Sequence, residues 1–217
     1  MERLIALATA TRRGGAALFE NGEPVARREI APTETGGARL LSAARGCLEE
    51  TDLTWENLSA VAVALGPGSF TGIRVGLATA LGLVESLGLK LIGVGSLDCI
   101  ARGAKGELRE GETVCATLPA GAGLYYAQLF RDGEPLGGCG LVPAGELGAR
   151  YPAGAYIGSD LEFIKKTAGR VLRRPDWVSP VHLGTLAWER LVRGETDDPA
   201  RIRPLYVKRP AARPTPR

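Results

Sequence analysis

The chain has few of the residues on which hydrolases and metalloenzymes depend. Its 217 residues include a single histidine, His182, and no Gly-x-Ser-x-Gly sequence. A metallopeptidase motif needs paired histidines, so composition excludes that class, and a serine-hydrolase elbow is missing as well. We expect His182 to be a structural residue near the start of a helix. The cysteines form no C-x-x-C pair, which argues against zinc and favours four reduced, mostly buried thiols: Cys47, Cys99, Cys115 and Cys139.

Long apolar runs and strong charge are also missing. No run of about 18 apolar residues, the length that crosses a membrane, is free of charge or glycine. The amino-terminal MERLIALAT has the length of a strand and no secretory pattern, so we expect a cytoplasmic protein. The formal net charge of +3 arises from four basic residues in the acid-free last ten, and the body is near −1. We expect this Pro-rich tail, residues 208–217, to be extended and solvated rather than a primary nucleic-acid site.

The most specific stretch runs from Ala60 to Ser96 and predicts a strand, a glycine loop, a long helix and a second strand. Ala60–Leu65 is rich in valine, which is typical of a strand buried on both faces. Ser69 or Thr71 can cap the helix at its start, and Gly88 can end it. A unit of this size forms a right-handed crossover between parallel strands.

The glycine loop departs from the usual phosphate-binding fingerprints. No Lys-Ser or Lys-Thr follows its glycines, as a Walker A loop requires. Thr71 stands where the dinucleotide fingerprint needs its third glycine. Because helix N-termini attract anions, phosphate binding stays open. The spacing favours a tight structural turn.

The predicted helix carries almost no charge on either face. One broad arc is apolar and comprises Phe70, Ile73, Leu77, Ala80, Leu81, Leu83, Val84 and Leu87. The opposite face is small: Gly72, Val75, Ala78, Thr79, Gly82 and Ser86. Only Arg74 and Glu85 form a charged seam between them. Such a face is either covered by the chain's own second half or used against a partner, and both readings stay open here.

An internal repeat indicates two related halves. Leu18–Val25 (LFENGEPV) is echoed by Leu129–Leu136 (LFRDGEPL), and each centres on an Asn-Gly or Asp-Gly hairpin turn. We therefore predict half-domains at residues 1–102 and 103–207, followed by the tail 208–217. The first half is expected to contain a helix at about Glu34–Glu50. For the second half we predict strands at Leu136–Val142 and Tyr156–Gly158 and helices at Asp160–Ala168 and Leu183–Arg193.

The sequence GPGSFTGIRVGLATALGL, followed by IGVGSLD, resembles the central motif of the TsaB (YeaZ) family. LIALATAT and PLYVKRP are similar to its opening strand and closing segment. The resemblance implies an α/β fold of two actin-like (ribonuclease H-like, ASKHA) half-domains. It also implies a non-catalytic role in making threonylcarbamoyladenosine of tRNA, in a group once labelled M22 glycoproteases. The implied partners are a TsaD-like catalytic subunit, a TsaE-like ATPase in the same complex and, when the chain is alone, a second copy of itself. Contact with tRNA is expected to be only indirect, and no contact with a membrane is expected.

The resemblance also implies site residues. The partner face comprises Gly72, Val75, Ala78, Thr79, Gly82 and Ser86, joined by Gly36 and Gly37 of the preceding helix. The motif loop comprises Gly66, Pro67, Gly68, Ser69, Phe70, Thr71 and Arg74. No catalytic residue, cofactor or metal is expected, because the turns Ala8–Arg13 and Pro119–Gly123 contain no acid to hold a metal-bound nucleotide. Two alternatives stay open: an actin-like ATP-dependent phosphotransferase that uses the loop 66–72, and a TsaB-like homodimeric scaffold for another partner.

Overall fold

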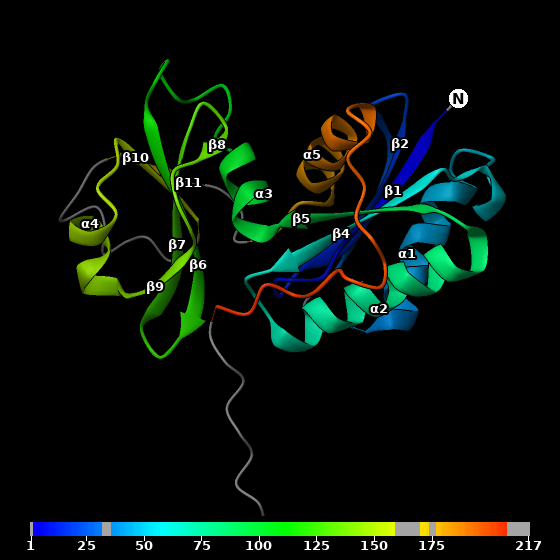
Figure 1. Cartoon of the computed structure of the whole chain (residues 1–217), viewed down its shortest axis with the longest axis horizontal. Coiled ribbons are helices and arrows are strands. Elements are labelled where there is room, and N and C mark those ends of the chain that lie inside the picture. The colour runs from blue at the N-terminus through cyan, green and yellow to red at the C-terminus, as the bar shows by residue number, and fades with distance from the viewer. Residues whose placement is uncertain (1, 32–35, 159–169, 174–176, 208–217) are drawn as a thin grey trace, which may run out of the picture.

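The structure consists of two lobes, each built around one sheet (Figure 1). This computed structural model describes residues 2–31, 36–158, 170–173 and 177–207. The first lobe has a five-stranded sheet in the order β3-β2-β1-β4-β5. The second has a six-stranded sheet in the order β11-β10-β6-β7-β8, with β9 paired to β7. The predicted α/β fold with two sheets is therefore confirmed.

The first sheet joins an antiparallel meander to two parallel strands. Its strands are β1 (Arg3–Ala8), β2 (Gly14–Glu20), β3 (Glu23–Ile30), β4 (Ala60–Gly66) and β5 (Lys90–Gly95). Asn21 and Gly22 connect β2 to β3 with φ of 50° and 93°, as an Asn-Gly hairpin turn requires. β4 pairs in parallel with β5, as the strand–helix–strand pattern predicts, and it also pairs in parallel with β1.

Successive side chains of the central strands point to opposite faces of the first sheet, so the first lobe has a core on each face. Ile5 and Leu7 of β1 pack on the side of α1 (Gly37–Glu49) and α2 (Phe70–Leu87). Ala6 and Ala8 pack on the side of α5 (Pro180–Val192), which lies across the sheet from α1 and α2 (Figure 1). The alanines let α5 come close, and a Cβ added at Gly184 of α5 would collide with the ring of Phe19.

The second lobe repeats the antiparallel start of the first. Its strands are β6 (Thr113–Gly121), β7 (Leu124–Arg131), β8 (Glu134–Pro135), β9 (Gly140–Pro143), β10 (Ala155–Gly158) and β11 (Arg170–Arg173). Its short helices are α3 (Ser96–Arg102), α4 (Leu147–Arg150) and the 3-10 turn Ala144–Glu146, while the 3-10 turn Trp55–Asn57 belongs to the first lobe. α3 follows β5 directly, and Leu97 and Ile100 of α3 pack in the core of the second lobe. The connection between the lobes is therefore a packed helix.

The chain returns to the first lobe after the second. The sequence assigns a helix at Leu183–Arg193 to the half-domain 103–207, yet α5 packs on the first sheet. An amphipathic pattern shows which face of a helix is buried but not which sheet receives it. The strand predicted at Leu136–Val142 is shorter, Gly140–Pro143. The predicted helix Asp160–Ala168, the first two residues of the helix Glu34–Glu50 and the tail 208–217 lie outside the described residues.

Candidate functional site

The glycines of the motif loop are required by close packing against the β1–β2 turn. A Cβ added at Gly68 would collide with the carbonyl oxygen of Ala10, and one at Gly72 with that of Thr9. The Ser69 N–H donates to the Ala10 oxygen at 2.7 Å, and the Thr9 hydroxyl donates to the Gly72 oxygen at 2.7 Å. The loop and the turn are therefore locked together, which supports the structural reading of these glycines.

The ends of α2 follow the sequence prediction. The Ser69 hydroxyl accepts a hydrogen bond from the Gly72 N–H at 3.2 Å, so Ser69 rather than Thr71 caps the helix. Gly88 ends it in the left-handed conformation with φ of 67°. Gly66 and Gly68 also have positive φ, 107° and 157°, on either side of Pro67.

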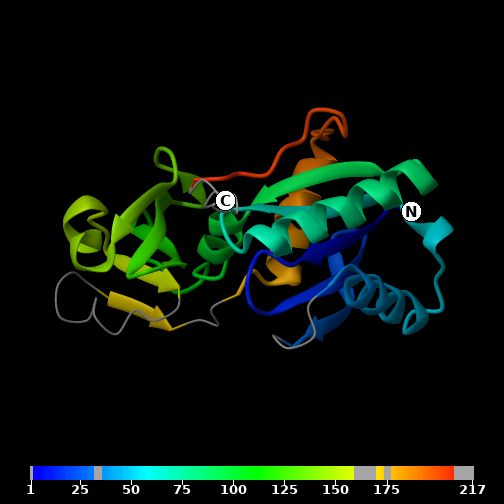
Figure 2. The same cartoon turned by 90° about the horizontal axis from the view of Figure 1, so that it is seen from below.

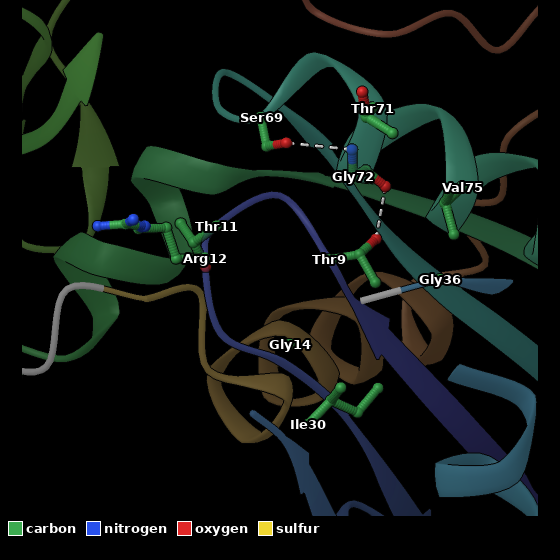
Figure 3. A pocket seen from close by; sticks show the side chains of 10 residues that line it. All are labelled: Thr9, Thr11, Arg12, Gly14, Ile30, Gly36, Ser69, Thr71, Gly72 and Val75. Carbon is green, nitrogen blue, oxygen red and sulfur yellow. Dashed lines mark hydrogen bonds between the residues drawn. The ribbon is translucent and has the colours of Figure 1, made fainter. Parts of the chain in front are cut away.

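A pocket of about 390 Å³ lies between the β1–β2 turn and the start of α2 (Figure 3). It is lined by Thr9, Thr11, Arg12, Gly14, Ile30, Gly36, Ser69, Thr71, Gly72 and Val75, of which none is acidic. The Thr11 hydroxyl is already engaged, because it donates to the Arg13 oxygen and accepts from the Val178 N–H. In the described part of the chain, no three histidine, cysteine, aspartate or glutamate side chains gather as a metal site would require. The pocket thus offers hydroxyls and one guanidinium.

The outer face of α2 is open to solvent. Ala78, Gly82 and Ser86 are exposed, Gly72, Val75 and Thr79 are half-buried, and nothing lies within 4 Å of a Cβ added at Gly82. No described residue of the second lobe covers this face, so the reading in which the chain's own second half buries it is wrong for the part of the chain that the structure describes. Of the 18 residues of α2, four are buried: Ile73, Gly76, Leu77 and Ala80.

α2 is also long and apolar enough, by length and composition alone, to cross a membrane. It connects β4 and β5, which are hydrogen-bonded neighbours in one sheet. A helix tied at both ends to the same sheet packs along that sheet, as α2 does. Its apolar character therefore describes a helix that is half core and half open surface.

α1 lies beside α2 and extends the open face. At Gly37 an added Cβ would stand 3.7 Å from the Thr79 hydroxyl and 3.9 Å from Val75, so the two helices come close at this point. Gly36 caps α1 with φ of 150° and lines the pocket. Farther along, a groove of about 580 Å³ between the helices is lined by Ala38, Leu41, Ser42, Arg45, Trp55, Glu56, Leu83, Ser86 and Leu87. Leu41 is 40% exposed there.

One cluster next to the motif loop was missed by sequence reasoning. The guanidinium of Arg74 lies 3.8 Å above the ring of Phe70, and its Nε donates to the Tyr206 hydroxyl at 3.0 Å. The two rings have centroids 4.9 Å apart. Arg74 and Tyr206 are 132 positions apart, so no local pattern joins them. The only available signal was that both belong to segments that resemble one family.

The four cysteine thiols lie in surroundings that keep them protonated. Burial raises the pKa of Cys47 and Cys139 to about 11 and that of Cys115 to about 12, and it raises the pKa of Cys99 as well. Cys139 is half-buried and the other three are buried, as predicted. Such thiols stay protonated and unreactive at neutral pH. His182 lies in the first turn of α5, and a Cβ added at Gly103 would stand 3.1 Å from its ring.

These features define an actin-like α/β protein with an open two-helix face. A family model described as TsaD, tRNA N6-adenosine threonylcarbamoyltransferase, matches residues 36–159. YeaZ from Pseudomonas aeruginosa has the same fold, with a TM-score of 0.82 at 24% identity over 95% of this chain and 100% of that one. The chain belongs to the TsaB (YeaZ) family.

Sequence relatives agree with this assignment. The chain is 36% identical to the tRNA threonylcarbamoyladenosine biosynthesis protein TsaB of Escherichia coli over 60% of this chain and 56% of that protein. It is 32% identical to an uncharacterised protein of Mycobacterium tuberculosis over 81% of this chain and 76% of that one. The chain thus spans about half the length of the curated TsaB proteins that it matches.

Proposed function

We propose that this chain is a non-catalytic, cytoplasmic subunit that binds and activates a TsaD-like enzyme in making threonylcarbamoyladenosine of tRNA. The pathway comes from the relatives, because the E. coli protein is named for this biosynthesis. The partner role rests on one observation of the structure: α2 turns an exposed, uncharged face of small residues to solvent, beside α1.

The chemistry of this face suits another pair of helices. Ala78, Gly82 and Ser86 let a partner backbone approach closely, and burial of a face without charge costs little desolvation. A TsaD-like subunit related to this chain would present a similar pair, which gives a four-helix interface with pseudo-two-fold symmetry. In its absence a second copy would use the same face for an isologous homodimer. We propose that a TsaE-like ATPase belongs to the same complex. In this proposal tRNA binds to the catalytic subunit and contacts this chain only indirectly.

The lack of catalysis is supported by the pocket and by the two turns. Actin-like ATPases hold a metal-bound nucleotide with carboxylates at the turns of both halves. Here the first turn starts at Ala8, which is fully buried, and the second is Pro119–Gly123, whose glycines 121 and 123 are exposed. Neither turn supplies a carboxylate, so neither could hold the magnesium ion of a bound nucleotide.

Association with a TsaD-like subunit tests the proposal. We expect the wild-type chain to co-purify with that subunit from its native cell and to raise its output of modified tRNA. Gly82→Glu should abolish both while the melting temperature of the isolated chain stays close to that of wild type, because the site is open. Ala149→Glu adds the same charge at an exposed position of the second lobe and should leave association intact.

Two outcomes would overturn this function. A folded Gly82→Glu variant that binds the TsaD-like subunit with wild-type affinity would remove the face from the interface. A rise of several degrees in melting temperature with Mg-ATP, together with ATP turnover that is lost on changing Thr71 or Arg74, would favour the phosphotransferase.

A further inference from the structure

The open face of α2 has one charge of each sign, Arg74 near the start of the helix and Glu85 near its end. Both residues are exposed, and neither forms an ion pair with a described residue. Eleven residues are three full turns plus about 20°, so the two charges lie along one line on the helix, about 16 Å apart. Figure 2 shows α2 between α1 and the segment 197–207. The line of charges lies on the side of that segment, because Arg74 contacts Tyr206 whereas Thr79 faces α1.

The guanidinium of Arg74 is oriented by two aromatic residues. It lies 3.8 Å above the ring of Phe70, and its Nε donates to the Tyr206 hydroxyl at 3.0 Å. Its two terminal amino groups have no hydrogen-bond partner among the described residues. These groups form a planar fork that matches a carboxylate, and because the side chain is already held in place, little conformational freedom is lost on binding. The start of α2 is therefore suited to an acidic side chain of a partner.

The smallest residues of the face lie at the centre of this charge pattern. The midpoint between Arg74 and Glu85 falls between positions 79 and 80, and the exposed Ala78 and Gly82 flank it. Nothing lies within 4 Å of a Cβ added at Gly82, so a second helix can approach α2 here at the short end of the usual axial separation of about 8–10 Å. At that separation the long side chains of arginine and glutamate reach the neighbouring helix.

Other exposed charges near this face do not disturb the pattern. Arg45 and Glu49 of α1 pair with each other at 3.2 Å. Arg39 of α1 lines a cavity on the side of β3, away from α2. Glu56 lines the groove beside the end of α2, so it adds to the negative charge at the end that carries Glu85. One end of the face is therefore positive and the other negative.

We propose that Arg74 and Glu85 set the register of a homodimer in which two copies of α2 pack antiparallel. A two-fold axis at the midpoint, perpendicular to both helices, places Arg74 of each copy beside Glu85 of the other and forms two equivalent ion pairs. Parallel packing would place like charges together, which disfavours it. The inference rests on the proposed use of the α2 face by a second copy, and it adds the residues that select the orientation of that copy.

Charge reversal followed by mixing tests the register. Analytical ultracentrifugation at about 0.1 M salt, where the Debye length is about 10 Å, measures the dimer dissociation constant. Arg74→Glu and Glu85→Arg each place like charges together at both ends of the interface and should weaken self-association at least about tenfold. An equimolar mixture of the two variants should form a heterodimer within about threefold of the wild-type affinity, because every pair again has opposite signs. The double variant Arg74→Glu/Glu85→Arg should recover in the same way.

Two controls separate the register from general effects of charge and folding. Arg109→Glu reverses an exposed charge on the segment that leads to β6 and should dimerise as wild type. Arg74→Glu also removes the contacts to Phe70 and Tyr206, so its melting temperature is compared with that of wild type. Glu85→Arg removes no ion pair of the described residues and tests the pairing by itself.

Three results would contradict the register. One is a wild-type chain that stays monomeric up to a millimolar concentration. Another is a folded Glu85→Arg variant that dimerises as wild type, or an equal loss from Arg109→Glu. The third is a mixture of the two folded single variants that fails to associate. The TsaD-like subunit is absent from these measurements, so they can reject the register while co-purification still supports the partner role, and the reverse also holds.

Discussion

Gly72 and Gly82 lie on the same helix but differ in the space around them. Gly72 faces the Thr9 oxygen and has no room for a Cβ, whereas Gly82 faces open space. Gly72→Ala should therefore lower the free energy of unfolding by about 1–3 kcal/mol, through overpacking against backbone. Gly82→Ala should raise it by about 0.5–1 kcal/mol, because alanine is the better helix former at an exposed position.

Urea denaturation of both variants beside wild type gives these values. Opposite signs are the expected result. If Gly72→Ala were as stable as wild type, the close approach between the loop and the β1–β2 turn would not constrain this position.

Asp98 in α3 gives the fold a dependence on pH. Burial raises the pKa of its carboxyl, an effect that its own backbone N–H opposes and that Glu134 adds to slightly. A folded-state pKa above the unfolded value favours the protonated form in the fold. The stability that comes from burying the neutral Asp98 carboxyl is therefore fully present below the pKa of Asp98 in the unfolded chain. It is lost as the pH rises through the pKa of Asp98 in the folded chain. Asp98→Asn, which stays neutral, should gain in melting temperature relative to wild type between pH 4 and pH 7. A constant difference across this range would contradict the assignment.

At the scale of elements, the crossover β4–α2–β5 was readable because every local signal agreed. A valine-rich run, a capping serine, an apolar arc and a terminal glycine mark its start, body and end, and the structure places Ser69 and Gly88 accordingly. The sequence predicted the composition of the open face of α2 but not its exposure. Its small, uncharged residues fit both burial and docking, and the absence of the second lobe from this face is a property of the tertiary structure.

The elements that sequence placed wrongly or missed depend on contacts between distant residues. α5 is amphipathic in sequence, but its choice of the first sheet depends on the alanines of β1 and β4. The segment 197–207, here called the C-terminal strap, has no helical or strand periodicity. Its hydrogen bonds to β4 and β5 join residues more than 100 positions apart. Spacing rules act over one or two turns, so they carry no information on such contacts.

At the scale of the whole molecule, the strap should stabilise both lobes. It covers the edge of β5, and its Ile202 is buried in the core of the first lobe. A chain that stops after Thr196 should lose at least about 2 kcal/mol of unfolding free energy, because a buried isoleucine is removed. It should also aggregate, because β5 becomes an unprotected edge. Chemical denaturation and light scattering measure the two effects.

A chain that stops after Val207 is the matched control. It lacks only the ten tail residues and should stay within about 0.5 kcal/mol of wild type, as surface changes usually do. Equal stability of the two shortened chains would show that the strap does not support the fold.

The return of α5 to the first sheet sets an order for folding on the ribosome. The described buried core of the second lobe comes from one part of the chain, from Leu97 of α3 to Leu172 of β11, whereas the first lobe needs residues 3–95 and 180–205 together. Ala6 and Ala8 leave the ribosome early, but the helix that covers them is made after the whole second lobe. One face of the first sheet therefore stays uncovered until translation has passed the second lobe. During this interval its apolar surface is exposed, and a chaperone would be needed to protect it.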